Sequence, residues 1–440
     1  MSEQRPTDTE MLTGRGSTCW YDEQNACLDR RVFWDEHIYD QELERIFRRC
    51  WLFVAHESQI PKPGAFVSTY MGNTSVLVVR QRDLSIKVLV NTCPHRGNRV
   101  CHAELGNARG FVCNYHGWSF GLDGRMTGLH EAAVFERTPG FDKRKIGLPQ
   151  AAQIATYKGL VFATFDPAAP PLDEYLGAYR WYLDIVLDND ERGTEFLPGA
   201  FKSVMRCNWK VPAENFTGDA LHAGWTHDAG SQAVFGKGIN PTSEDGLQIN
   251  INGHGWQVDS KYPVGNAATL GYKSILRYFR EREPAVAQRL GAVRARMAGA
   301  ISSASIFPNF SFLPGQSTFR VWHPLGPREV ELHAFVLVNC GAPAEIKEAY
   351  RKGNMMTFSP TGLFEIDDGE NWEFCTQSNR SAESRRQPSH YGLGLGSEVP
   401  SSELPGNVFR CQVNDANQRA FYRRWAQFMS AKSWTDISAC

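Results

Sequence analysis

Four metal-binding side chains lie in two short pairs on either side of a glycine-bearing loop. The stretch "CPHRGNRVCHAELGNARGFVCNYHGWSF" pairs Cys93 with His95 and Cys113 with His116. A Cys₂His₂ zinc finger groups its cysteines first and its histidines later, whereas each segment here offers one thiolate and one imidazole. If the segments form two loop tips, the thiolates can bind one metal ion and the imidazoles another.

This donor set is the one that a Rieske [2Fe–2S] cluster requires, with two cysteines on one iron and two histidines on the other. Neutral imidazoles raise the reduction potential of such a cluster to roughly −150 to +300 mV, so it can accept electrons from a ferredoxin and pass them on. Gly97, Gly110 and Gly117 would let the loop backbone approach the cluster closely. A structural zinc site is the alternative for the same four ligands. Cys101 and His102 break the paired spacing and are interpreted as loop residues.

The stretch resembles the Rieske motif of ring-hydroxylating oxygenases. The resemblance includes Arg96 and Gly97 after the first histidine and Trp118 after the second. It implies that the four paired residues hold the cluster.

A second group of ligand types lies in "NWKVPAENFTGDALHAGWTH", which contains Asp219, His222 and His227. A non-haem ferrous oxygenase binds iron through two histidines and one carboxylate on one face and leaves positions open for O₂. The alternative is that the two histidines are satisfied residues of the core. Asp219 lies three residues before His222 and shares its helix face, so from spacing alone it is a candidate for the carboxylate.

The spacing of the two histidines conflicts with a regular helix. Residues five apart are separated by about 140° around an ideal helix, so both can reach one metal only if the helix is distorted or ends between them. We predict an irregularity between Leu221 and Thr226, such as a π-bulge, which Gly224 would make less costly.

The motif "ENFTGDALHAGWTH" is similar to the α subunits of naphthalene, biphenyl and polycyclic-hydrocarbon dioxygenases, as are "DDGENW" and "NQRAFYRRWAQFM". This resemblance implies that Asp219 is a bridge from a ligand histidine toward a Rieske histidine of the neighbouring subunit. It implies Asp368 as the third iron ligand, with Asp367 as the alternative. Leu221 departs from the family, which usually has Tyr at this position.

The bulk composition excludes several classes of protein. The net charge of 440 residues is −1, so no overall field favours nucleic acid or a membrane surface. No apolar run approaches the ~18 residues of a membrane span, and the polar residues 1–18 have no signal-peptide core and are interpreted as a loose tail. Eleven irregularly spaced cysteines argue against a disulfide framework and favour a reducing cytoplasm.

The pattern along the chain predicts an α+β fold that carries an inserted β domain. Short β-branched runs broken by turn residues predict an all-β Rieske [2Fe–2S] domain over residues 50–170. Residues 1–49 and 171–440 would form the catalytic mononuclear-iron domain, for which the resemblance implies a helix-grip (Bet v1-like) antiparallel sheet with helices. Helices are expected over 283–302 and 415–431, and strands over 317–325 and 329–340.

The resemblance further implies the terminal oxygenase α subunit of a multicomponent dioxygenase for aromatic-hydrocarbon catabolism. Such an enzyme uses O₂ and electrons from NADH to form a cis-dihydrodiol. The chain has no strand–GxGxxG–helix unit, so NADH would bind a separate reductase, with or without a ferredoxin. A trimeric core is implied, α₃ or, with a small β subunit, α₃β₃.

The resemblance also implies a substrate pocket without Lys or Arg, which favours an uncharged aromatic hydrocarbon because a desolvated charge needs a partner. Trp209, Trp225 and Trp322 are expected to be packing residues. The implied pocket residues are Asn215, Phe216, Ala220, Ala223, Ile301, Ser303, Leu313, Phe358 and Phe364.

Two other functions remain open at this point. One is a monooxygenase of the same superfamily that acts on a salicylate-like acid. The other is a Rieske electron-transfer or redox-sensing protein without catalysis.

Overall fold

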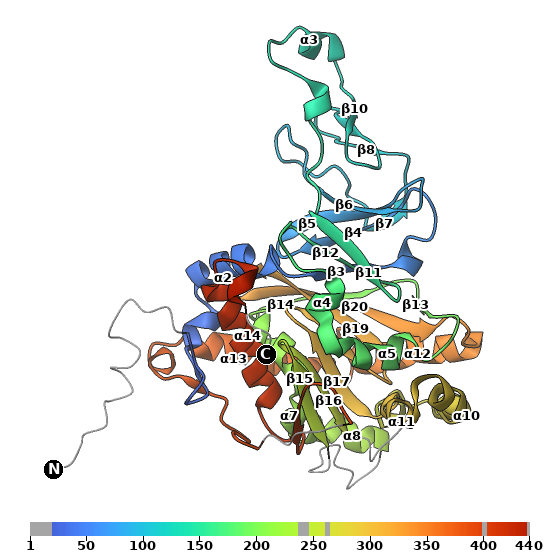
Figure 1. Cartoon of the computed structure of the whole chain (residues 1–440), viewed down its shortest axis with the longest axis vertical. Helices are drawn as coiled ribbons and strands as arrows, with labels where there is room; N and C mark the ends of the chain where they lie inside the picture. The colour runs from blue at the N-terminus through green and yellow to red at the C-terminus, as the bar shows by residue number, and fades with distance from the viewer. Residues whose placement is uncertain (1–19, 236–245, 260–264, 398–402, 438–440) are drawn as a thin grey trace, which may run out of the picture. The chain divides into compact units, whose positions relative to one another are not determined.

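The computed structural model describes residues 20–235, 246–259, 265–397 and 403–437. The tail expected over residues 1–18 therefore lies outside the described residues. The chain divides into two compact units: a small unit, Phe47–Leu172, and a large unit that combines Met1–Ile46 with Asp173–Cys440. The small unit is thus an insertion in the sequence of the large one (Figure 1).

The small unit consists of three antiparallel sheets. Val-rich segments with few helix formers pair through tight turns, as β-branched residues favour. The sheets, in strand order, are β6 (Ile86–Val90), β5 (Thr74–Arg80), β4 (Ala65–Met71) and β7 (Leu105–Asn107); β11 (Gln153–Tyr157), β12 (Leu160–Thr164) and β3 (Leu52–His56); and β10 (Met126–Gly128), β9 (Ser119–Phe120) and β8 (Phe111–Val112). A short helix, α3 (Ala132–Glu136), interrupts the otherwise β-rich unit.

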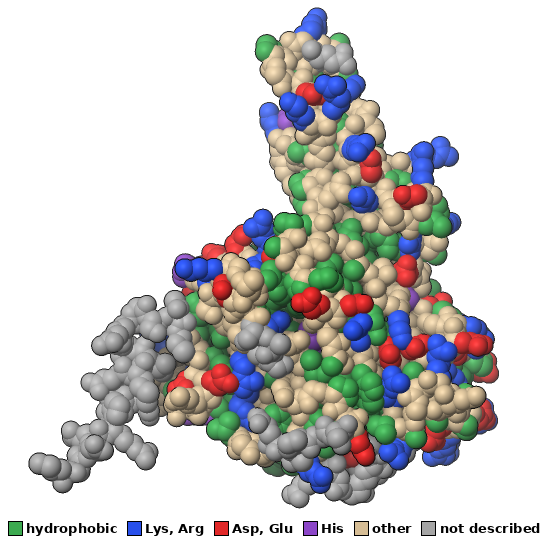
Figure 2. Space-filling model, in the orientation of Figure 1, with side chains coloured by type: hydrophobic (Ala, Val, Ile, Leu, Met, Phe, Trp, Pro, Cys, Tyr) green, Lys and Arg blue, Asp and Glu red, His purple; other side chains and the backbone are tan. Residues whose placement is uncertain are grey.

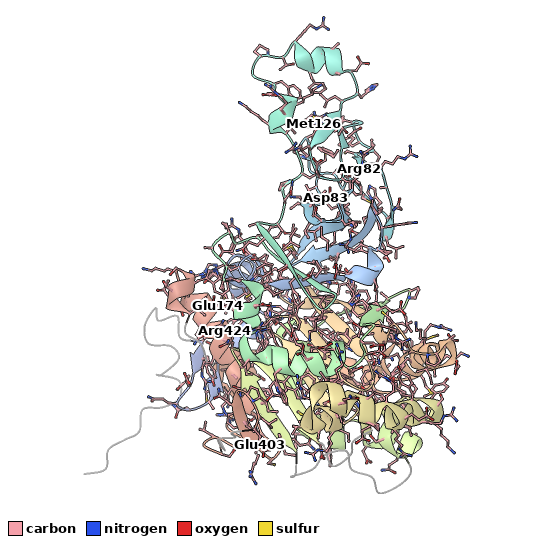
Figure 3. All side chains as sticks on the ribbon, turned by 45° about the vertical axis from the view of Figure 1, so that its right-hand side comes forward. Arg82, Asp83, Met126, Glu174, Glu403 and Arg424 are labelled. Carbon is pink, nitrogen blue, oxygen red and sulfur yellow. The ribbon has the colours of Figure 1, made fainter. Side chains whose placement is uncertain are left out.

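The core of the small unit surrounds the candidate cluster ligands. Cys93 and Cys113 are buried in one apolar cluster with Phe111, Trp118 and Met126. Figure 3 labels Met126, on strand β10, and the turn residues Arg82 and Asp83 between β5 and β6. The Asp83 carboxylate accepts the Ser85 N–H at 3.0 Å and so closes this turn.

The large unit is built on one antiparallel sheet, in which β14 (Phe201–Met205) pairs with β20 beside β13. Burial of every residue of β16 and of most residues of β19 shows that these strands are covered on both faces. The strand order is β13 (Thr194–Phe196), β20 (Glu329–Asn339), β19 (Thr318–Gly326), β18 (Phe310–Leu313), β17 (Ile301–Ile306), β16 (His254–Asp259), β15 (Leu247–Ile251) and β22 (Asn407–Arg410). A separate small sheet joins β1 (Tyr21–Asp22), β2 (Cys27–Leu28) and β21 (Ser389–His390).

Helices cover this sheet. Helix α14 (Ala416–Ser430) contacts β15 and β16 (Figure 1). Helix α6 (Lys210–Gly218) contacts β16, β17 and β18. Gly253, in the β15–β16 turn, has φ +81°, and a Cβ there would meet the Arg424 side chain of α14 at 2.5 Å. The other helices are α2 (Glu36–Glu42), which continues into a π turn (Leu43–Phe47), α4 (Leu172–Leu176), α5 (Arg180–Leu187), α7 (Ala220–Trp225), α8 (Asp228–Phe235), α9 (Gly265–Thr269), α10 (Lys273–Leu290), α11 (Ala292–Met297), α12 (Ala344–Phe358) and α13 (Glu365–Asn379).

The mixture of helices and antiparallel sheet confirms the predicted α+β fold. The expected strands correspond to β19 and β20, and the expected C-terminal helix corresponds to α14. The helix expected over 283–302 was wrong in its extent: α10 begins at Lys273, the helix breaks at Gly291 with φ +88°, and Ile301 already belongs to β17. On the face shown in Figure 2, acidic and basic side chains are interspersed, consistent with the net charge of −1.

Candidate metal centres and active site

The two ligand loops of the small unit repeat one turn. The Gly97 N–H donates to the Cys93 carbonyl at 2.9 Å, and the Gly117 N–H donates to the Cys113 carbonyl at the same distance. Both glycines have positive φ, +77° and +72°, a conformation that costs glycine little. Each turn therefore presents one cysteine and one histidine.

The donor atoms of these loops fit a cluster with two thiolate and two imidazole ligands. The Cys93 and Cys113 side chains are buried, and the rings of His95 and His116 lie 4.4 Å apart between centroids. The Nδ1 atoms of both histidines are buried without a hydrogen-bond partner in the described part of the chain. Buried ring nitrogens are rarely left unpaired, and metal ions would satisfy both.

Two neighbouring side chains shape this site. The Trp118 indole stacks on the His95 ring, with centroids 4.6 Å apart and planes 7° from parallel. The Asn98 amide nitrogen donates to Cys113 Sγ at 3.7 Å and to the Asn114 side-chain oxygen at 2.8 Å. A hydrogen bond to a cluster thiolate favours the reduced state and so raises the potential.

The residues inside the span that were interpreted as loop residues lie outside regular structure. Cys101 is half-buried, and its thiol donates to the Ala103 carbonyl at 3.8 Å; His102 is exposed. Cys101 packs against the apolar cluster that contains Cys93 and Cys113.

In the large unit, two helix breaks position the second group of ligand types. Helix α6 ends at Gly218, and Asp219 caps α7 by accepting the His222 N–H at 3.2 Å. Helix α7 ends at Trp225, and His227 lies in the turn before α8 begins at Asp228. The chain therefore leaves the helical path between the two histidines.

The predicted irregularity exists, but its place and form differ from the expectation. Gly224 lies within regular helix, and the Thr226 N–H makes a normal i→i−4 bond to the His222 carbonyl at 2.7 Å. The break falls at Thr226 and His227, at the edge of the predicted range, and it is a helix end instead of a π-bulge. Because α7 ends before His227, the chain can change the direction of the His227 side chain without breaking the hydrogen bonds of α7.

The two imidazoles and one carboxylate converge. His227 Nε2 lies 3.2 Å, and His222 Nε2 3.5 Å, from Asp368 Oδ1. One ligand atom from each of the three residues lies within 4.8 Å of those of the other two. Asp368 is 3 % exposed in the first turn of α13. This arrangement has the composition and closeness of the two-histidine, one-carboxylate site that binds ferrous iron.

Asp367 and Asp368 have different surroundings although they are neighbours. Asp367 is 39 % exposed, and its Oδ2 lies 3.9 Å from His227 Nδ1, the ring nitrogen away from Asp368. One residue step turns a side chain about 100° around a helix. The structure thus brings Asp368, and not Asp367, into the three-residue cluster.

Asp219 contacts the other edge of His222. Its Oδ2 lies 3.4 Å from His222 Nδ1, and the Asn215 amide nitrogen lies 3.2 Å from the same ring nitrogen. Burial by itself would raise the pKa of Asp219, but the His222 ring and N–H groups at the start of α7 hold it below its usual value. These contacts favour the carboxylate form of Asp219 beside the His222 ring.

A cavity opens beside this cluster. It contains about 770 Å³ of empty space, including solvent at its mouth, within the size range of small-molecule sites. No Lys or Arg is among the described residues that line it. The nine residues expected from the sequence all line the cavity: Asn215, Phe216, Ala220, Ala223, Ile301, Ser303, Leu313, Phe358 and Phe364.

The cavity also has lining residues that the sequence analysis missed. All six are polar; Ser302 lies between the predicted Ile301 and Ser303, and Ser231 follows His227 by four residues. Only the strand pairing places Gln257 at the cavity, because β16 sets it opposite Ser303 of β17. The missed residues are Ser231, Gln257, Thr269, Ser302, Gln316 and Gln412.

The three tryptophans expected to pack do not behave alike. Trp209 and Trp322 are fully buried, but Trp225 is 87 % exposed on α7. Leu221, on the same helix, is 54 % exposed. The expectation for Trp225 was therefore wrong: its large apolar side chain faces solvent in the isolated chain.

Together, a β domain with two Cys–His loops and a sheet-and-helix domain with a His–His–Asp cluster facing a largely apolar cavity define a Rieske non-haem iron oxygenase. Residues 172–431 match the family described as ring hydroxylating alpha subunit (catalytic domain), and residues 50–139 match the Rieske [2Fe-2S] domain. The chain belongs to the family of ring-hydroxylating dioxygenase α subunits.

Individual relatives agree with this assignment. The biphenyl dioxygenase subunit alpha of Metapseudomonas furukawaii is 42 % identical, covering 94 % of this chain and 93 % of its own. The benzene 1,2-dioxygenase subunit alpha of Pseudomonas putida is 39 % identical, covering 95 % and 94 %. The solved structure of a naphthalene 1,2-dioxygenase variant bound to phenanthrene superimposes with a TM-score of 0.90 at 31 % identity, covering 96 % of each chain.

The predicted class of enzyme and its cofactors are thereby confirmed. The protein is an oxidoreductase that incorporates O₂, the α subunit of an aromatic ring-hydroxylating dioxygenase, and it carries a Rieske [2Fe–2S] cluster and a mononuclear iron. The family works with ferredoxin and reductase partners. Among the helices that the structure describes, none is long and apolar enough to cross a membrane.

Proposed function

We propose that this α subunit cis-dihydroxylates an uncharged aromatic hydrocarbon of the size of naphthalene or biphenyl. The observation that carries the proposal is the largely apolar cavity that borders the His222–His227–Asp368 cluster and has no Lys or Arg in its described lining. An aromatic carboxylate would be desolvated there next to Asp219 and Asp368 without a cationic partner. The reaction joins the arene, O₂, NADH and H⁺ to give a cis-dihydrodiol and NAD⁺.

The cluster ligands in this proposal are Cys93, His95, Cys113 and His116. Their loops hold both thiols in an apolar core, and the stack of Trp118 on His95 restrains one imidazole. The cluster, when bound, supplies single electrons.

The ligands of the mononuclear iron in this proposal are His222, His227 and Asp368. Iron, when bound, supplies the centre at which O₂ is activated. The carboxylates that flank His222 favour a cation at this place: burial would lower its pKa, yet Asp219 and Asp368 raise it to about 9. The same negative field that retains a proton on an imidazole favours a divalent ion.

The catalytic roles fall to Asp219 and Asn215. Asp219 holds the Nδ1 edge of His222, so that the Nε2 edge faces Asp368. Asn215 contacts the same Nδ1 and restrains the ring further. Asp219 would also connect His222 to His116 of a neighbouring subunit, as electron transfer between the two kinds of centre requires.

A trimeric core, α₃ or α₃β₃ with a small β subunit, would provide that neighbour. The exposed Trp225 and Leu221 support a subunit interface, because they lie on α7, which Asp219 caps. A ferredoxin or reductase would deliver electrons from NADH. We place the enzyme in the cytoplasm, where the nine described cysteines, none of which is in a disulfide, would remain reduced.

Incubation of the reconstituted system with naphthalene and biphenyl under ¹⁸O₂ tests the proposal. We expect a cis-dihydrodiol with two labelled oxygen atoms and three irons per α chain. A product with one labelled atom would indicate a monooxygenase. Two irons per chain without hydroxylation would indicate an electron carrier, and zinc in place of iron would indicate a structural site.

A further inference from the structure

The cavity beside the His–His–Asp cluster has one polar wall that the oxidation of a plain hydrocarbon does not use. The apolar lining includes Phe216, Ala220, Phe358 and Phe364, whereas the polar lining includes Ser303, Gln257, Gln412 and Gln316 from four separate segments. Polar side chains in an otherwise apolar pocket normally select a ligand group.

Three of these side chains form a directed chain of hydrogen bonds. The Ser303 hydroxyl donates to Gln257 Oε1 at 3.4 Å, and Gln257 Nε2 donates to Gln412 Oε1. Gln412 Nε2 follows as the last donor and has no hydrogen-bond partner among the described residues. The chain therefore ends in a cavity-lining residue whose terminal amide N–H is unsatisfied.

Gln412 is buried and held in place. Its residue is 0 % exposed, its backbone carbonyl accepts from Gln248 Nε2 at 2.8 Å, and Cys411 before it adopts a left-handed φ of +71°. On its other side, a Cβ on Gly246 would meet the Gln412 side chain at 2.8 Å, so the glycine leaves room for the amide. An amide restrained in this way loses little entropy when a ligand binds.

An unpaired buried donor destabilises the fold unless something accepts its hydrogen bond. The ligand most suited to this donor fits the aromatic cavity and carries a neutral acceptor. An anionic acceptor is disfavoured by Asp219 and Asp368, which line the same cavity. The aromatic ring would then lie on the apolar side, beside the histidines.

We propose that Gln412, positioned by Gln257 and Ser303, is a specificity-determining residue that donates a hydrogen bond to a neutral acceptor, such as a ketone oxygen, on a polycyclic aromatic substrate. The inference rests on the proposed function and names a narrower substrate class within it: aromatic ketones and related oxygen-bearing polycycles, in addition to plain hydrocarbons.

Equilibrium binding of a matched pair tests this recognition without depending on turnover. The oxidised holoenzyme is titrated with 9-fluorenone and with fluorene, which differ in one carbonyl. We expect the ratio of their dissociation constants, ketone to hydrocarbon, to rise about tenfold in Gln412→Met, as the loss of one hydrogen bond from a restrained donor predicts. A ratio that changes less than twofold would overturn the proposal.

A control variant and a second readout complete the test. Gln316→Met removes another amide of the cavity lining, whose unpaired atom, Oε1, is an acceptor and cannot donate, and it should leave the ratio within twofold of the wild type. The infrared carbonyl stretch of 9-fluorenone bound to the wild-type holoenzyme should shift to lower frequency relative to an apolar solvent. An unshifted stretch would overturn the proposal even if Gln412→Met does not fold.

Failure of this inference differs from failure of the proposed function. If cis-dihydrodiols form from naphthalene or biphenyl but the infrared shift is absent, only the assignment of Gln412 is wrong. If the infrared shift is present but no hydrocarbon is oxidised with two labelled atoms, the recognition stands and the proposed reaction is wrong.

Discussion

Asp219 and His222 form a contact in which the carboxylate Oδ2 lies 3.4 Å from ring Nδ1, while the opposite ring nitrogen faces Asp368. Asp219 also caps the helix that carries His222. One side chain thus sets both the start of α7 and the orientation of an imidazole in the cluster. In the proposed function His222 binds the metal and Asp219 lies on the electron path toward it. Metal binding and electron transfer can therefore be tested by different substitutions.

The first prediction concerns Asp219→Asn. Asn is also a good N-cap, so we expect the fold and both iron centres to remain. Loss of the carboxylate should lower turnover at least 100-fold because electrons would no longer reach the catalytic centre. Iron content shows whether both centres remain, and single-turnover reduction kinetics measure electron transfer to the catalytic centre. Asp228→Asn on the neighbouring α8 is the control. Normal turnover in Asp219→Asn would refute the assigned role.

The second prediction concerns the His–His–Asp cluster. His222→Ala and Asp368→Asn should each reduce the iron content from three to about two per chain and abolish hydroxylation, because two remaining ligands bind iron weakly. The visible spectrum of the Rieske cluster should be unchanged. Asp367→Asn is the matched control and should retain its iron. Loss of iron in Asp367→Asn, with retention in Asp368→Asn, would reverse the assignment.

The third prediction concerns the potential of the cluster. Asn98→Ala removes the donor to Cys113 Sγ and should lower the midpoint potential. A hydrogen bond worth about 1 kcal/mol corresponds to roughly 40 mV for a one-electron couple. A redox titration followed by electron paramagnetic resonance gives the value. Asn114→Ala removes the other partner of Asn98 but leaves the sulfur bond, so its potential should remain near that of the wild type.

The fourth prediction concerns acid stability. His254 is buried, accepts the Phe307 N–H at Nδ1 at 3.0 Å, and its Nε2 lies 3.1 Å from the Tyr175 carbonyl. Burial lowers its pKa to about 3, below the unfolded value of 6.5. The unfolded chain therefore binds the proton first, and stability is lost as the pH falls from 6.5 toward 3, by at most about 1.4 kcal/mol per unit for this group.

Thermal unfolding midpoints at pH 7.5, 6.5 and 5.5 measure this loss. His254→Gln should be less stable than the wild type at pH 7.5 and should lose less on acidification. His37→Gln, at an exposed position of α2, is the control. An equal or steeper loss in His254→Gln than in the wild type would contradict the prediction.

Local patterns were sufficient where the chemistry is local. Cys93–His95 and Cys113–His116 indicated a Rieske cluster because each pair lies within one turn, and the order of ligand types excluded a common zinc finger. The spacing of His222 and His227 required a departure from the helix, since helical geometry depends only on the separation of residues. The resemblance in these motifs indicated the family, which the relatives confirmed.

The form of the helix break could not be predicted from the same residues. Gly224 made a π-bulge plausible, yet the chain ends α7 after Trp225 and turns at Thr226 and His227. Both solutions bring the imidazoles together, so local spacing does not choose between them. Trp225 likewise has the large apolar side chain that is typical of a core residue, but it is exposed on α7 in the isolated chain.

By itself, the sequence determined the two kinds of metal centre and the family, because ligand type and short-range spacing are properties of the chain. The tertiary structure alone decided which nearby groups meet across long separations. Asp368 reaches Nε2 of both histidines whereas Asp367 lies at Nδ1 of His227 alone, because α13 turns adjacent residues to different sides. Gln257 and Gln412, 155 residues apart, form one wall because their strands and loops close around the same cavity.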